Sequence, residues 1–301
     1  QKPETKHDMN LMKLIDTFDS EGDCRKALEQ LRWPDGVRCP HCESDYIRNT
    51  PSRNQYDCGV CGYQFSVISG TMLHDTHLPL RKWFVAVYLM IEGRKGVSAN
   101  QLKRTINVAY RTAWYLCHRV RVAMESAEPI KLKDRVEVDE TYIGGKVRGK
   151  GRGYRGNKSM VVGAVQRGDK IVLKVVTARD AATLRAFVEE HTDDAETTHI
   201  YTDENPAYVD VGDEDTVHET VNHSIEEWVR GEVHINSAEG VWSLLKRSVI
   251  GSYHHVSVKH LDKYLDELEW RFNHRDNPYL FRDTLRQLLQ SEHVEYKELV
   301  A

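Results

Sequence analysis

The chain has 301 residues and a formal net charge of −4, with 40% hydrophobic and 29% charged residues. This composition is ordinary for a soluble globular protein, and the length allows a sizeable core and two or three domains. No apolar run reaches the roughly 18 residues of a membrane helix, and the amino terminus, QKPETKHDMN, lacks an apolar signal core. We therefore expect a cytoplasmic protein without a membrane span.

The first part of the chain has a helical pattern. Apolar residues recur at helical spacing over residues 8–20 and 23–32, which predicts a short helical lead-in within residues 1–34. The turn sequence WPDG, residues 33–36, then leads into a different kind of segment, residues 35–70.

The chain has six cysteines, and the four in that segment form two CxxC pairs separated by fifteen residues: Cys39, Cys42, Cys58 and Cys61. Two such pairs on short, turn-rich segments predict a zinc ribbon, in which tetrahedral thiolate coordination of Zn²⁺ supplies folding energy that so small a segment lacks. Disulfides are disfavoured because no secretory context is visible. A redox role is disfavoured because no strand-to-helix pattern follows. We expect Cys24 and Cys117 to be ordinary thiols.

Residues 78–126 are predicted to be helical, over 79–92, 98–106 and 109–124. The last two have a tight connection, which suggests a helix-turn-helix whose second helix enters the DNA major groove. Nine Lys or Arg residues and one acid lie between positions 81 and 121, and Arg111, Arg119 and Arg121 of the second helix are the candidate DNA contacts. A plain helical bundle with a basic outer face is the alternative.

From about residue 133 the pattern changes. Strands are predicted over 135–143, 159–166, 170–177, 198–202 and 215–221, and helices over 181–192 and from residues 237 and 257. Three strands followed by alternating helix and strand are typical of a ribonuclease-H-like α/β domain, a mixed five-stranded sheet with flanking helices. We expect this domain over residues 133–276, followed by a carboxy-terminal helical tail, 277–301.

Three carboxylates occupy informative positions in that domain. Asp139 and Asp203 lie on or at the end of predicted strands, and Glu239 opens a helix. Converging buried carboxylates repel one another unless a cation lies between them, and Mg²⁺ prefers such ligands. Taken singly, Asp139 and Asp203 are typical strand-end carboxylates, and Asn236 with Glu239 fits a helix-capping pair. Lys246 shares a helix face with Glu239 and is placed to steer a phosphate.

A glycine-rich basic segment, GGKVRGKGRGYRGNK, joins the first two strands of the predicted sheet. Its six basic residues suit contact with DNA phosphates: Lys146, Arg148, Lys150, Arg152, Arg155 and Lys158. A flexible solvated loop without a ligand is the alternative. Residues 180–239, by contrast, contain seventeen acids and two arginines, so the charge distribution predicts separate DNA-facing and solvent- or metal-facing surfaces.

Several sequence segments together resemble the insertion-sequence transposases of the DDE superfamily that carry an amino-terminal zinc ribbon and are related to the Merlin elements. The segments are WPDGVRCPHC, CGVCGYQFSVISGTMLHDTHLPLRKW, VEVDETYIGGK, IYTDENPAY, VNHS and HINSAEGVWSLLKRSVIGSYHHVS. The resemblance covers nearly the whole chain. It implies catalytic carboxylates at Asp139, Asp203 and Glu239, with Lys246 assisting. Members of the group vary at the third carboxylate, so Asn236 or His234 is a candidate contributor beside Glu239.

The implied activity is cleavage at element ends and strand transfer into target DNA, using two ions of Mg²⁺ or Mn²⁺ held by the three carboxylates. The expected partner is double-stranded DNA, both the terminal inverted repeats of the element and the target, with a homodimer or higher oligomer bringing two ends together. We expect a nucleoid-associated prokaryotic protein. Two alternatives remain: a ribonuclease-H-like nuclease without joining activity, and a domesticated zinc-ribbon regulator that only binds DNA.

Overall fold

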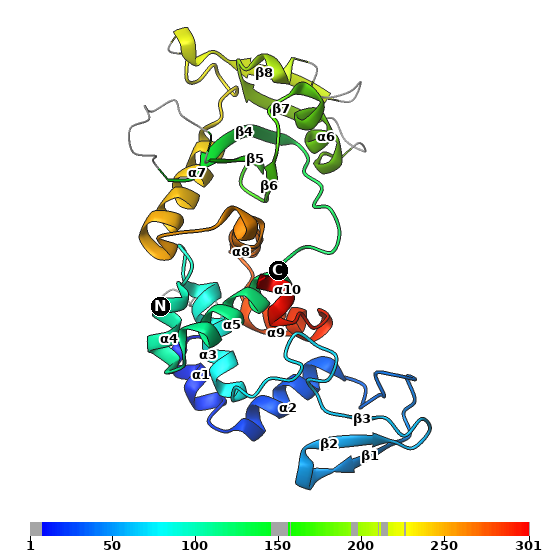
Figure 1. The fold of residues 1–301 in the computed structure, drawn as a ribbon. Coiled ribbons are helices and arrows are strands. Elements are labelled where there is room, and N and C mark those ends of the chain that lie inside the picture. The colour runs from blue at the N-terminus through cyan, green and yellow to red at the C-terminus, as the bar shows by residue number, and fades with distance from the viewer. Residues whose placement is uncertain are drawn as a thin grey trace, which may run out of the picture. The chain divides into compact units, whose positions relative to one another are not determined.

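The computed structural model describes residues 8–145, 156, 158–193, 198–209, 211, 216–225 and 227–300. The chain divides into two compact units. The first contains residues 1–124 and 274–301, and the second contains residues 125–273 (Figure 1). None of the helices within the described ranges is long and apolar enough to cross a membrane.

The first unit begins with helices α1, Leu11–Thr17, and α2, Glu21–Arg32. Ser20 and Asp23 form a capping box that satisfies free N–H groups at the start of α2. A small antiparallel sheet follows, with strands β1, Ile47–Thr50, β2, Gln55–Cys58, and β3, Gln64–Phe65. The side chain of Arg32 donates to the backbone carbonyls of Val67 and Ser69, and so ties α2 to the segment after β3.

Five further helices complete this unit: α3, Leu80–Glu92, α4, Ala99–Ile106, α5, Tyr110–Ala123, α9, Leu280–Gln290, and α10, Tyr296–Val300. Helices α4 and α5 follow each other closely, as the sequence predicted, with Asn107 in the left-handed conformation at the end of α4. The carboxy-terminal helices pack into this unit. The ring of Phe281 contacts those of Phe18 and Phe84, and the hydroxyl of Tyr115 donates to the carbonyl of Val294.

The second unit is built on a five-stranded mixed sheet in the order β6-β5-β4-β7-β8. Its strands are β4, Arg135–Ile143, β5, Ser159–Gln166, β6, Ile171–Val176, β7, Thr198–Asp203, and β8, Thr216–Val221. Strands β4, β5 and β6 pair antiparallel, whereas β4, β7 and β8 pair parallel. The observed bounds lie within about one residue of the predicted ones, and the predicted mixed sheet with flanking helices is confirmed.

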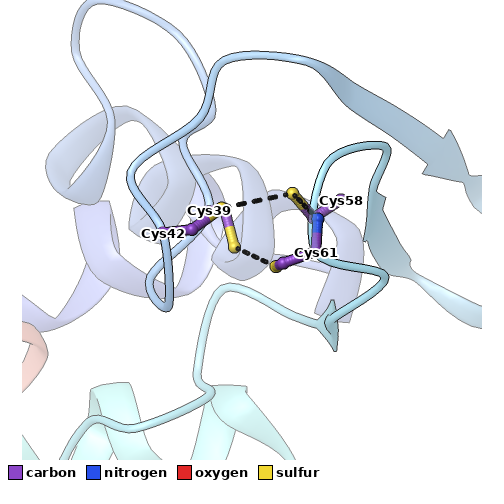
Figure 2. A group of neighbouring side chains, drawn as sticks. All are labelled: Cys39, Cys42, Cys58 and Cys61. Carbon is purple, nitrogen blue, oxygen red and sulfur yellow. Dashed lines mark hydrogen bonds between the residues drawn. The ribbon is translucent and has the colours of Figure 1, made fainter.

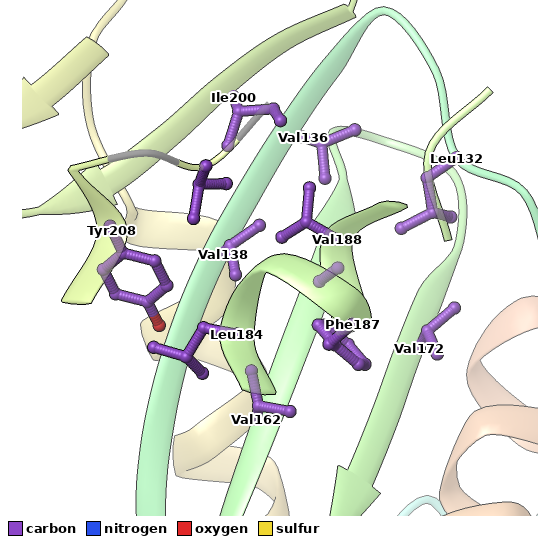
Figure 3. Packing of buried hydrophobic residues seen from close by; sticks show 12 residues of the cluster. Leu132, Val136, Val138, Val162, Val172, Leu184, Phe187, Val188, Ile200 and Tyr208 are labelled. Atoms are coloured by element: carbon purple, nitrogen blue, oxygen red, sulfur yellow. The ribbon is translucent and has the colours of Figure 1, made fainter. Parts of the chain in front are cut away.

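Helices cover both faces of this sheet. Helix α6, Ala181–His191, packs its Leu184, Phe187 and Val188 on one face, against Val136 and Val138 of β4 (Figure 3). Helices α7, Asn236–Ser248, and α8, Leu261–Asn273, form the apolar core of the other face. A short 3-10 turn precedes α8, so this helix begins four residues later than predicted.

Helix α8 also shields the open edge of the sheet. The side chain of Asn273 accepts from the N–H of Ile171 and donates to its carbonyl, and the N–H of Leu173 donates to Glu269. Glu269 and Asn273, one helical turn apart on α8, therefore supply hydrogen-bond partners to the backbone groups of Leu173 and Ile171 on the edge strand β6. An exposed edge strand can pair with another chain, and this arrangement prevents it.

Candidate active site and zinc ribbon

The parallel pairing of β4 with β7 brings Asp139 and Asp203 together. The two strands pair through Arg135 with His199 and Glu137 with Tyr201. The same register, continued two residues further, sets Asp139 opposite Asp203. Residues opposite each other in a sheet share a face, so both carboxylates lie on the face that α7 covers.

Asp139 is partly buried and is held by helix α7. The indole Nε1–H of Trp242 donates to its Oδ2 at 2.8 Å. Burial, with the charges of Glu140 and Asp203 nearby, raises the pKa of Asp139 to about 7. The indole lies over Gly163 of β5, the residue that pairs with Asp139, where a Cβ atom would be 2.5 Å from the indole. A glycine is therefore needed for Trp242 to reach the carboxylate.

Asp203 ends β7 and is oriented by the turn that follows. The backbone N–H of Asn205 donates to its Oδ1 at 3.0 Å. The 3-10 turn Pro206–Tyr208 is tied in turn to Glu140 of β4, because the Tyr208 hydroxyl donates to Glu140 Oε2 at 2.7 Å. Glu140 also pairs with Arg179, and burial raises its pKa. Glu140 points to the opposite sheet face from Asp139, since successive strand residues alternate.

Glu239 lies exposed in the first turn of α7, three residues before Trp242. The expected capping pair of Asn236 and Glu239 is not present. Ile235 occupies the N-cap position, Asn236 is the first helical residue, and no side chain of the helix caps it. Glu239 is therefore not used as a cap. Lys246 lies exposed in the last turn of α7.

The carboxylate that caps α7 comes from β4. Glu137 accepts from the backbone N–H groups of Ser237 at 2.7 Å and Ala238 at 3.0 Å. His234 points its Nδ1 toward Glu137 as well, at 3.2 Å. Glu137 and Asp139 are two residues apart on one face of β4, so α7 is attached to this strand at both Ser237 and Trp242, on either side of Glu239.

These residues fit a divalent cation in their chemistry. Carboxylate oxygens are the ligands that Mg²⁺ and Mn²⁺ prefer, and because burial and the neighbouring carboxylates raise the pKa of Asp139, a cation bound there would stabilise its charged form. Within the described residues, one group of three or more potential ligands has all its ligand atoms within 4.8 Å of one another, and it is not the carboxylate set. An Mg²⁺ ion needs only one or two protein carboxylates, so the wider spacing is compatible with binding.

That compact group consists of the four ribbon cysteines (Figure 2). The sulfur atoms of Cys39 and Cys61 are 3.7 Å apart, and those of Cys42 and Cys58 are 3.5 Å apart. A tetrahedral zinc site with Zn–S bonds near 2.3 Å requires sulfur separations of about 3.8 Å. The N–H of Cys61 donates to the Cys58 sulfur and lowers the pKa of that thiol to about 6, which favours the thiolate that zinc binds. The predicted zinc ligands therefore fit the metal.

The predicted DNA contacts on α5 differ in their exposure. Arg111 is exposed near the start of α5, beside exposed Tyr110. Arg119 and Arg121 are buried, and Arg119 donates to the carbonyl of His74 and lies over the ring of Trp83. These two arginines are therefore not exposed for contact with DNA.

In the basic segment, Lys158 is half-buried immediately before β5. The other five residues lie outside the described part of the chain: Lys146, Arg148, Lys150, Arg152 and Arg155.

Four residues that orient the carboxylates were not predicted from the sequence: Glu137, Glu140, Tyr208 and Trp242. One signal was present for the first. The alternation of RVEVDETYI places Glu137 on the same strand face as Asp139, among apolar neighbours, where a carboxylate must find donors. The donors lie 30 residues further along the chain, at Arg167, and about a hundred residues further, at Ser237 and Ala238, and no local pattern indicates them.

Comparison with known proteins gives two family matches. Residues 131–273 match the ISXO2-like transposase domain, and residues 19–64 match the transposase zinc-ribbon domain. A protein of Halobacterium salinarum, described as an uncharacterized protein in transposable element ISH50, is 31% identical over 276 residues, with 85% of this chain and 92% of the relative covered.

Two solved structures show a distant similarity. One is the Mos1 transposase paired-end complex with left transposon end, with a TM-score of 0.27 and 10% identity over 70% of this chain and 80% of that chain. The other is the Mos1 strand transfer complex, with a TM-score of 0.29 and 12% identity over 70% and 79%.

Proposed function

This chain belongs to the DDE insertion-sequence transposases with an ISXO2-like transposase domain and a zinc ribbon, and we propose that Asp139, Asp203 and Glu239 carry its chemistry. In this proposal the protein cuts the ends of its element and joins them to target DNA. The observation that supports it is that β7 and α7, the elements that carry Asp203 and Glu239, are both bonded to β4, which carries Asp139. Asp203 lies beside Asp139 by strand register, and Glu239 lies between the two points where α7 is bonded to β4.

Two of the three proposed ligands, Asp139 and Asp203, are oriented before any substrate arrives. The Trp242 indole occupies Oδ2 of Asp139, and the Asn205 N–H occupies Oδ1 of Asp203, so the side chains are fixed by contacts within the protein. Bound Mg²⁺ or Mn²⁺ would supply the positive charge that activates an attacking hydroxyl and stabilises the leaving oxygen at a phosphodiester. Lys246, exposed two turns after Glu239, is positioned to bind a DNA phosphate.

The first unit supplies the proposed DNA recognition. The exposed start of α5, with Tyr110, Arg111 and Thr112, is the part of a second helix that reads base edges in a helix-turn-helix. We assign the zinc ribbon and the basic segment before β5 to the remaining contacts with the element end. Two ends must be joined in one event, so the active form is a dimer or a higher oligomer on DNA.

The substitution Asp139→Asn tests the assignment. It keeps the size of the side chain and removes the charge that a cation needs, so it abolishes strand transfer of a labelled element end while binding of that end persists. Strand transfer at the wild-type rate in this variant would refute the assignment. The same assay on the wild-type protein distinguishes the alternatives: cleavage without joining identifies a nuclease, and Mg²⁺-independent binding without nicking identifies a regulator.

A further inference from the structure

Glu137 is a fully buried carboxylate next to the proposed active site. Its side chain is 0% exposed, and it lies on β4 two residues before Asp139. An isolated buried carboxylate is costly, so its position must be stabilised by donors around it.

Four hydrogen bonds satisfy the two oxygens of Glu137. Oε2 accepts from the backbone N–H groups of Ser237 and Ala238. Oε1 accepts from the Ser237 hydroxyl at 3.0 Å and from Arg167 Nε at 2.6 Å. This set of donors leaves Glu137 unsuited to bind a cation, in contrast to Asp139, and it marks the residue as an anchor.

The anchor fixes the helix that carries Glu239. The first N–H groups of a helix have no partner within it, and α7 has no capping side chain of its own. Glu137 therefore satisfies N–H groups that would otherwise be unpaired, with its negative charge at the favourable end of the helix dipole. Arg167 joins the same arrangement, because its Nη2 donates to the carbonyl of His234, two residues before α7.

We propose that Glu137 is a positioning residue, which holds the first turn of α7 against β4 so that Glu239 is presented beside Asp139 and Asp203. The inference rests on the proposed function for the role of Glu239. The attachment of α7 itself stands on the hydrogen bonds alone. Carboxylates that orient metal ligands typically change metal affinity by about 10- to 100-fold when they are substituted.

The experiment compares three variants of the full-length chain. Glu137→Gln keeps the shape of the side chain and removes its charge. Ser237→Ala removes one hydrogen bond to Glu137 and leaves the helix backbone intact. Val188→Ala, a buried residue of α6 on the opposite sheet face, is the control that lowers stability without touching α7.

The first readout is hydrogen exchange of the zinc-loaded protein without added Mg²⁺ or Mn²⁺. In Glu137→Gln the amides of residues 236–242 should exchange about tenfold faster than in the wild type, because the first turn of α7 opens locally. In Val188→Ala these amides should show no selective change relative to the rest of the second unit. Unchanged exchange in Glu137→Gln, or an equal change in the control, would overturn the proposal.

The second readout is Mn²⁺ binding, followed by electron paramagnetic resonance. The dissociation constant should rise about 10- to 100-fold in Glu137→Gln and about threefold to tenfold in Ser237→Ala, the effect of one net hydrogen bond. Wild-type affinity in both variants would overturn the proposal. If Glu137→Gln does not fold, Ser237→Ala decides the outcome. Neither readout requires strand transfer, so failure of the proposed function would appear separately, as a wild-type protein that does not join DNA.

Discussion

The contact between Gly163 and Trp242 gives a quantitative test of how Asp139 is held. Gly163 pairs with Asp139 across β4 and β5, and the Trp242 indole fills the space above it. In Gly163→Ala the new Cβ would be 2.5 Å from Trp242 Cη2 and 2.9 Å from Leu173 Cδ2. Both distances are shorter than carbon atoms tolerate, so the indole must move away from Asp139.

Two costs contribute to the expected loss of stability. Overpacking a close-packed core costs about 1–3 kcal/mol, and losing a hydrogen bond to a carboxylate costs about 1.5–3 kcal/mol. The two are not additive, because the same movement of Trp242 relieves the clash as it breaks the bond. We therefore expect Gly163→Ala to lower the free energy of unfolding of the second unit by about 2–4 kcal/mol.

Gly240 offers a matched control. It lies exposed within α7, and a Cβ atom there would meet nothing within 4 Å. Gly240→Ala should therefore raise stability by about 0.5–1 kcal/mol, the usual gain of Gly→Ala in a helix. The same chemical change is thus predicted to have opposite signs at two positions. The measurement is urea unfolding followed by circular dichroism, with the Trp242 indole N–H resonance reporting its hydrogen bond. An unshifted indole resonance in a Gly163→Ala protein of wild-type stability would refute the reasoning.

Three further predictions follow from other contacts. Cys42→Ser should release the ribbon zinc, measured with a chromogenic chelator, and expose residues 35–70 to proteolysis, because thiolate coordination provides much of the folding energy of such a segment. Burial raises the pKa of Glu269 to about 8, against 4.5 ordinarily, so its contribution to stability is present below pH 4.5 and is lost as the pH rises through 8. Urea titrations across this range should show the wild type losing on the order of a few kcal/mol relative to Glu269→Gln, and parallel curves would contradict the assignment. Arg111→Ala should weaken binding to the element end and reduce its salt dependence by about one counterion, whereas Arg119→Ala should lower stability, since Arg119 is buried.

Sequence patterns predicted the elements of this protein well because hydrophobic periodicity is a local property. The alternation in RVEVDETYI specifies β4, and the CxxC spacing specifies the ribbon. The register of β4 with β7, by contrast, is a long-range property. The ribonuclease-H-like strand order led us to expect Asp139 and Asp203 at one edge of the sheet, but these strands are joined through about fifty residues, and the exact register that pairs Glu137 with Tyr201 is visible only in the structure.

Two interpretations of local sequence were changed by tertiary contacts. Asn236 and Glu239 have the spacing of a capping pair, yet the donors at the start of α7 are satisfied by Glu137, which leaves Glu239 exposed. Arg119 and Arg121 contribute to a basic stretch that suggested a DNA-binding face, yet both are buried. A count of charges along a sequence does not show whether each charged side chain faces solvent or the interior. Aromatic rings from other helices, such as Trp83, accommodate an arginine inside the protein.

The contrast among the three acids of β4 explains why Asp139 is the best candidate for a metal ligand. All three lie within four residues of one strand, and the family resemblance, not the strand pattern, selected Asp139. Glu137 has four donors, among them Arg167, and Glu140 accepts from Tyr208 and pairs with Arg179, so each of these two acids has an arginine as its charged partner within the protein. Asp139 has one side-chain donor among the described residues, the Trp242 indole, and a pKa raised to about 7. A bound cation would supply to Asp139 the positive charge that Arg167 supplies to Glu137 and Arg179 supplies to Glu140.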